Sequence, residues 1–230
     1  MRKRKYVILI LNILIIYSIF KIVMIYSNYS KIENNISNLK EAVVSYDETS
    51  SSIDFNYLLN LNSDVVAWIK IPDTLIDEPV LQGATNELYL RTDIYKNYSI
   101  AGSIFIDERN SKKFDDELTI MYGHHMKNGT RFSDIKKFSD KIFFDEHEYI
   151  YLYLPDKTEY RYKITSFAMI NSNDPIYNCN GTYDFYMQSI KNQSIHQREI
   201  SKEQAPLLLL STCVNATGEE RYVLLGKLDN

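Results

Sequence analysis

The chain has 230 residues, enough for one sizeable domain and an additional segment. Its hydrophobic content of 45% excludes an intrinsically disordered chain, and only 7 glycines and 5 prolines argue against a low-complexity or collagen-like protein. The formal net charge of −4 argues against nucleic acid as the main partner.

The N-terminal segment predicts a membrane anchor. Four basic residues at 2–5 precede an almost wholly apolar run at 6–26, whose length matches the roughly 20 residues that cross a bilayer as a helix. Basic residues flank the cytoplasmic side of a span, so residues 1–5 are expected in the cytoplasm and everything after residue 26 outside. A cleaved signal peptide is the alternative, but no A-x-A-like cleavage site follows the run.

Residues 27–52 are expected to form an extracellular helical stalk and a linker. Apolar residues recur at spacings of three and four, which indicates one helical stripe: Ile32, Ile36, Leu39 and Val43. The polar stretch YDETSSS at 46–52 is typical of a linker, and the globular domain is expected to cover 53–230.

The domain itself has a mainly β pattern of the α+β type. Short strands are predicted at 65–71, 80–82, 103–107, 118–122, 149–154, 159–170, 207–211 and 222–228. Helical segments are expected at 53–60, within 86–95, at 133–138 with Ser133 as N-cap, and at 183–190. Many short strands with few helices favour a closed or nearly closed β-barrel with helices on its periphery.

Three residues could together carry acyl-transfer chemistry. Cys213 ends a predicted strand, Arg221 begins the next one, and His124 follows another strand and a glycine. A cysteine needs a proton-transfer partner to act as a nucleophile, and the developing oxyanion needs a donor. Simpler interpretations are a disulfide between Cys179 and Cys213, an arginine that keeps an edge strand soluble, and a histidine in a turn. Motifs for phosphate, dinucleotide or zinc binding are not found in the sequence, and no cofactor or metal is expected.

Several stretches resemble the class B sortases. The segment LSTC at 210–213 resembles the sortase pattern T-L-x-T-C, with Leu209 in place of the first threonine. The segment YGHHMKNGTRF at 122–132 resembles the class B stretch around the catalytic histidine. Two further segments, at 68–83 and 101–110, complete a resemblance that covers the domain from about residue 53 onward.

The resemblance implies an eight-stranded sortase barrel with peripheral helices and an N-terminal helical extension. It implies a membrane-tethered cysteine transpeptidase of a Gram-positive bacterium, with Cys213 as nucleophile, His124 as acid and base, and Arg221 as oxyanion or substrate-positioning residue. The first histidine after the glycine is the catalytic one in this family, which favours His124 over His125. The residues that would line the groove for the sorting signal are Asn86, Leu90, Ser172, Tyr177 and Ser211.

The implied reaction cleaves a C-terminal sorting motif of secreted proteins after threonine through a thioacyl intermediate. An amine on a lipid II-type peptidoglycan precursor would then take up the acyl group, so the expected partners are sorting-signal proteins, that precursor and the membrane. Two alternatives stay open: a sortase that polymerises pilin subunits, and a catalytically silent, surface-anchored binding domain.

Overall fold

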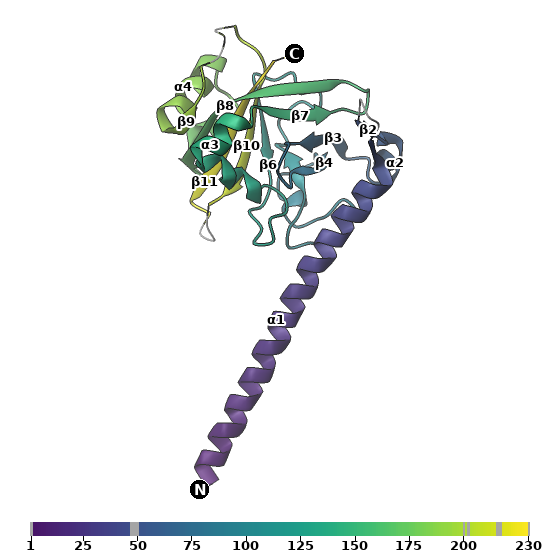
Figure 1. Ribbon diagram of the computed structural model, residues 1–230, viewed down its shortest axis with the longest axis vertical. Coiled ribbons are helices and arrows are strands. Elements are labelled where there is room, and N and C mark those ends of the chain that lie inside the picture. The colour runs from purple at the N-terminus through teal and green to yellow at the C-terminus, as the bar shows by residue number, and fades with distance from the viewer. Residues whose placement is uncertain (1, 47–50, 200, 202, 215–217, 230) are drawn as a thin grey trace. The chain divides into compact units, whose positions relative to one another are not determined.

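The computed structural model describes residues 2–46, 51–199, 201, 203–214 and 218–229 (Figure 1). The chain divides into two compact units, Met1–Ala42 and Val43–Asn230. The first unit consists of helix α1, which runs without interruption over Arg2–Val43 and whose last residue already counts with the second unit. Its large apolar side chains between residues 6 and 26 are exposed, and the helix is long and apolar enough to cross a membrane.

A short hairpin and a helix begin the second unit. Strand β1 (Val44–Tyr46) pairs antiparallel with β2 (Ser51–Ile53), so both ends of the predicted linker are extended, while residues 47–50 lie outside the described part of the chain. Helix α2 (Phe55–Leu61) follows, and the Asp54 carboxylate caps it by accepting the Tyr57 backbone N–H at 2.9 Å.

Nine described strands follow α2, and most of them close into a barrel. Their bounds are β3 (Val65–Lys70), β4 (Asp77–Leu81), β5 (Ile104–Ile106), β6 (Leu118–Tyr122), β7 (Tyr149–Tyr153), β8 (Glu159–Asn171), β9 (Ser194–Gln197), β10 (Leu207–Cys213) and β11 (Glu220–Leu228). Eight of them follow the order β11-β10-β6-β5-β4-β3-β7-β8, and β8 pairs with β11 to close the ring. Strand β9 adds to β8 outside this ring. The predicted eight-stranded barrel is therefore confirmed.

Strand β10 is buried on both of its faces. Alternate residues of a strand point to opposite sides of the sheet, and Leu208 and Leu210 belong to the main core cluster. Leu207 and Leu209 belong to a second cluster on the other face, which includes Tyr186 and Ile190 of helix α4 (Tyr183–Gln193). Helix α4 lies against β8, as Figure 1 shows. Two covered faces explain why β10 is a continuous apolar run rather than an alternating one.

The remaining elements are short helices on the periphery: η1 (Leu88–Leu90), η2 (Ser133–Ser139), α3 (Lys141–Glu146) and η3 (Pro175–Asn178). The prediction that Ser133 is an N-cap is wrong, because Phe132 occupies that position. The Ser133 hydroxyl instead accepts the Met126 backbone N–H at 2.6 Å and lies 2.8 Å from the Thr130 carbonyl oxygen. The hydroxyl thus closes the preceding loop and is not available to the helix.

Strand β4 begins earlier than predicted and contains Pro79. A proline removes one ladder donor, which a strand tolerates where it has no neighbour on that side. Strand β5 pairs with β4 only at Val80 and Leu81, whereas β3 pairs with β4 along most of its length. The proline therefore occupies a part of β4 that β5 does not reach.

Candidate active site

The end of β10 and the start of β11 place a thiol beside a guanidinium. Cys213 and Arg221 are direct partners in the antiparallel ladder between these strands. Arg221 Nη1 lies 2.7 Å from Cys213 Sγ and donates to it. Because residues two apart share a face, Ser211 and Cys213 continue the face of Leu207 and Leu209 beyond the region that α4 covers. The site is therefore the uncovered end of an otherwise buried sheet surface.

The parallel partner of β10 brings the histidine to the same end. Ser211 pairs with Tyr122 at the end of β6, and the Gly123 N–H donates to the Ser211 carbonyl at 3.2 Å. A side chain at Gly123 would meet the ring of Phe132 at 2.8 Å, which explains the glycine. His124 follows, and its carbonyl accepts the Phe132 N–H at 3.1 Å, so the loop returns next to the histidine.

The His124 imidazole is held by a carbonyl group of helix η1. Nε2 lies 2.8 Å from the Leu90 carbonyl oxygen, and since a carbonyl only accepts, Nε2 carries a proton. Burial lowers the pKa of His124; the Leu90 hydrogen bond opposes this, while Arg91, Arg131 and Arg221 lower the pKa further. The net effect is a lowered pKa. Because Nε2 donates to the Leu90 carbonyl, Nδ1 is the nitrogen that can gain or lose a proton.

All three predicted catalytic residues line one pocket. It has a volume of about 310 Å³ and is lined by Asn86, Leu90, Phe105, Tyr122, Gly123, His124, Ser211, Cys213 and Arg221. The structure thus brings together a sulfur, an imidazole and a guanidinium from three different segments of the chain. Their individual catalytic roles stay predictions.

The five predicted groove residues do not all lie in this pocket. Asn86, Leu90 and Ser211 line it, and the Tyr177 hydroxyl reaches it through a hydrogen bond of 2.8 Å to Ser211 Oγ. Ser172 is not among the lining residues; its backbone N–H donates at 2.7 Å to the carbonyl of Glu219, the residue just before β11.

Sequence reasoning missed two aromatic residues of the pocket wall. Tyr122 pairs with Ser211 on one side and with Phe105 of β5 on the other. The sequence predicts a strand for each of them and gives neither a place in the groove, whereas the register of β6 against β10 puts Tyr122 beside the site. Two signals in the sequence could have found them: Tyr122 lies two residues before His124, and Phe105 lies in the middle of the resembling segment 101–110.

His125 has a different position from His124. Its Nδ1 donates to the backbone carbonyl of Cys213 at 3.0 Å, and it is not among the pocket-lining residues. The two adjacent imidazoles therefore bind two separate carbonyl groups, those of Cys213 and Leu90.

Both cysteines are free thiols in the structure. Burial raises the pKa of Cys179 to about 11, and its sulfur lies 3.8 Å from the Tyr177 carbonyl oxygen. The disulfide that was open as an alternative is therefore not formed. Within the described residues, no cluster of three or more His, Cys, Asp or Glu side chains could hold a metal ion.

A strand-borne thiol with a paired arginine and a neighbouring histidine, on a closed eight-stranded barrel, defines a class of cysteine enzymes. Residues 69–229 match the model of the sortase domain, and the chain belongs to the sortase family. Sortases are cysteine transpeptidases, and the similarities described next make this chain a sortase B-like member.

Sequence and structure comparisons agree on class B. The chain is 37% identical to sortase B of Listeria monocytogenes over 183 residues, which covers 74% of this chain and 72% of the relative. The solved sortase B of Clostridium perfringens has a TM-score of 0.71 and 31% identity, and the match covers 77% of this chain and all (100%) of the other. A class B sortase of Streptococcus pyogenes involved in pilus biogenesis has a TM-score of 0.70 and 30% identity, and the match covers 76% of this chain and 98% of the other.

Acidification is expected to destabilise the fold through His124. Its folded-state pKa lies below the 6.5 of an ordinary imidazole, so the unfolded chain binds the proton more readily. The contribution is complete above pH 6.5 and is lost as the pH falls from there through the lowered pKa. Urea unfolding midpoints measured above and below pH 6.5 test this prediction. On acidification the wild type should lose more stability than His124→Gln. An identical pH dependence of the two proteins would contradict the lowered pKa of His124.

Proposed function

We propose that this chain is a membrane-anchored sortase that cleaves sorting signals after threonine and transfers the acyl group to a peptidoglycan amine. Family membership supports the transpeptidase reaction. The observation that carries the residue assignment is the single pocket shared by Cys213, His124 and Arg221, with a donor contact from Arg221 to the sulfur.

In the proposed mechanism, His124 takes the thiol proton of Cys213 on Nδ1, and Sγ attacks the carbonyl carbon of the threonine. The guanidinium of Arg221 is a permanent cation, and it is positioned to donate to the oxygen as negative charge develops there. His124 gives its proton to the leaving amine, so the C–N bond breaks and a thioester with Cys213 forms. An acceptor amine then attacks the thioester, and His124 takes up the amine proton. As the new amide forms, the C–S bond breaks and His124 returns this proton to the sulfur, which restores the thiol of Cys213.

The N-terminal helix supports a location at the membrane. We assign residues 1–5 to the cytoplasm, 6–26 to the membrane, 27–52 to an extracellular stalk and 53–230 to the catalytic domain, because the basic cluster precedes the apolar stretch. Anchoring enzyme, sorting-signal protein and a lipid-linked acceptor on one surface raises their effective concentration.

A peptide-cleavage assay with the full chain in vesicles tests the proposal. A library of sorting-motif peptides with threonine before the scissile bond is incubated with and without a lipid II-type amine acceptor. The expected products are cleavage after threonine and, with the acceptor, an amide-linked conjugate. Cleavage at other residues, or no conjugate with any amine, would contradict the proposed reaction.

Pilin polymerisation is the second candidate, favoured by the similarity to the streptococcal class B sortase involved in pilus biogenesis. In that case the acceptor would be a lysine side chain of another subunit rather than a peptidoglycan amine. Covalent ladders that form only with active enzyme and pilin subunits would favour it over cell-wall attachment.

A further inference from the structure

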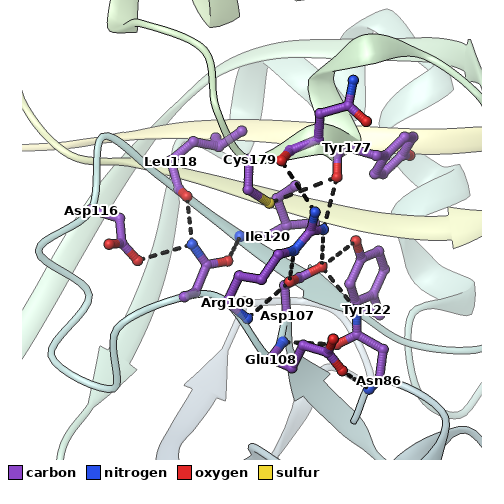
Figure 2. A network of polar contacts seen from close by, with 12 residues as sticks. Asn86, Asp107, Glu108, Arg109, Asp116, Leu118, Ile120, Tyr122, Tyr177 and Cys179 are labelled. Atoms are coloured by element: carbon purple, nitrogen blue, oxygen red, sulfur yellow. Dashed lines mark hydrogen bonds and ion pairs between the residues drawn. The ribbon is translucent and has the colours of Figure 1, made fainter.

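A buried carboxylate lies directly behind the pocket wall. Asp107 follows β5, is fully buried at 0% exposure, and accepts five hydrogen bonds (Figure 2). Three come from the backbone N–H, Nε and Nη2 of Arg109, at 3.1, 2.7 and 2.8 Å. The other two come from pocket-lining residues: Asn86 Nδ2 at 2.9 Å and the Tyr122 hydroxyl at 3.0 Å.

These contacts fix the orientation of both pocket residues. The Asn86 carbonyl oxygen accepts the Glu108 N–H at 2.8 Å, and its amide nitrogen donates to Asp107, so the two ends of the amide cannot be exchanged. The Asn86 backbone N–H is also held, by the Glu108 carboxylate at 2.8 Å. Tyr122 commits its hydroxyl proton to Asp107 and therefore presents its ring and an oxygen lone pair.

Arg109 extends the network to the other side of the groove. Its Nη2 donates to the Tyr177 carbonyl at 2.8 Å and its Nη1 to the Asn178 carbonyl at 3.1 Å. Tyr177 in turn binds Ser211 through its hydroxyl and stacks on Tyr122 with ring centroids 6.3 Å apart. One charged pair thus connects the wall formed by β5 and β6 with helix η3, two segments that are distant in sequence.

The carboxylate stays ionised in this position. Burial alone would raise the pKa of Asp107, but the hydrogen bonds from Arg109, Asn86 and Tyr122 together lower it below its usual value. The pKa of Arg109 is raised, mainly by its hydrogen bond with Asp107. A neutral amide in place of the carboxylate could not accept the same set of donors.

We propose that Asp107, with Arg109, is a positioning residue for the acyl donor: it holds Asn86, Tyr122 and the Tyr177 segment in the shape that binds the sorting peptide. Asp107 does not itself line the pocket and does not contact Cys213 or His124. This inference rests on the proposed function, since the peptide is the ligand whose binding is positioned.

The test replaces Asp107 with asparagine in the full chain and measures kcat and KM for a sorting peptide. Loss of the charge-assisted hydrogen bonds should raise KM by about tenfold or more, because Asn86 and Tyr122 are then no longer held in the orientation that binds the peptide. The alkylation rate of Cys213 by iodoacetamide should stay at the wild-type value, since the nucleophile is not touched. Arg109→Gln should raise KM in the same way, and Arg109→Lys should restore part of the affinity through its charge.

Asp116→Asn is the matched control. Asp116, labelled in Figure 2, lies in the neighbouring loop and does not line the pocket. It accepts hydrogen bonds from Asn110 Nδ2 at 2.9 Å and from the Ser111 N–H at 2.7 Å. Its replacement removes comparable bonds and should leave KM unchanged. A wild-type KM in folded Asp107→Asn, or an equal rise of KM in both variants, would overturn the proposal. If Asp107→Asn does not fold, the KM of Arg109→Gln tests the proposal instead. The Arg109 side chain is 47% exposed, so its replacement should disturb folding less.

A second measurement separates this inference from the proposed function. Failure of the wild type to cleave any sorting peptide would refute only the proposed function. The Asn86 side-chain amide signal in ¹H–¹⁵N spectra then reports on positioning. It should shift and exchange faster with solvent in Asp107→Asn but not in Asp116→Asn, and an unaltered signal in Asp107→Asn would overturn the inference.

Discussion

Replacing Cys213 with alanine is expected to abolish cleavage of sorting peptides while the fold survives. The thiol is the proposed nucleophile, and no other group in the pocket can form the thioester. Cys213 is the last residue of β10 and is only half-buried, so the substitution removes one sulfur without opening a cavity in the core. Chromatography of the peptide products measures the loss of cleavage, and the urea unfolding midpoint measures whether the fold is retained.

The other free cysteine supplies a control. Cys179→Ala also removes one thiol from the domain, and it is expected to keep cleavage activity because Cys179 does not line the pocket. Cleavage by Cys213→Ala at the wild-type rate would refute the assignment of the nucleophile.

Two variants of Arg221 test its contribution to the rate at the same site. Losing a preorganised donor to an oxyanion typically lowers kcat by roughly 10²–10³-fold, and Arg221→Met is expected to show a loss of that order. Arg221→Lys keeps the charge but not the planar set of donors, so it should recover only part of the rate. Equal activity of both variants and the wild type would leave Arg221 without a catalytic role.

Replacing Glu78 with glutamine is expected to destabilise the domain by about 3–5 kcal/mol. Glu78 of β4 and Arg131 are both buried and form an ion pair, and the Glu78 carboxylate also accepts the Arg131 backbone N–H at 3.1 Å. Arg131 has a positive φ of 59° and donates through Nη2 to the Gly102 carbonyl at 2.7 Å. Glutamine keeps the size of the side chain but leaves the buried guanidinium without a counter-charge.

The consequences should extend to the site, because Arg131 precedes Phe132, whose N–H binds the His124 carbonyl. Urea unfolding measures the free-energy loss. Asp145→Asn is the control: it breaks an exposed pair with Lys141 and should change stability little. A similar effect of both substitutions would show that the buried pair has no special structural importance.

Sequence reasoning predicted the barrel because most strands have a clear alternation or an apolar run bounded by turn residues. It missed α3 and β9, which are only six and four residues long and each expose an apolar side chain, Ile142 and Ile195, so neither shows a clear period of hydrophobic residues. In β10, the departure at Leu209 from the sortase pattern has a physical explanation in the structure. Leu209 packs in the cluster beneath α4, on the face that leads to Cys213 but away from the pocket.

The site was predictable where it depends on motifs and not where it depends on side-chain contacts across the fold. Cys213, His124 and Arg221 follow from the resembling segments, and all three line the same pocket. The Asp107 network could not be predicted, because its partners Asn86, Tyr122 and the Tyr177 carbonyl come together only when β5, β6 and η3 are packed. The position of Ser172 outside the pocket likewise depends on how the end of β8 meets β11.

Mass spectrometry of the acid-quenched reaction tests the central claim most directly. The full chain is mixed with a sorting peptide in the absence of an acceptor amine, quenched and digested. The proteolytic fragment that contains Cys213 should carry the mass of the peptide up to and including threonine, as a thioester that hydroxylamine removes. Turnover of the peptide without this adduct, or with the adduct on Cys179 instead, would contradict the proposed mechanism.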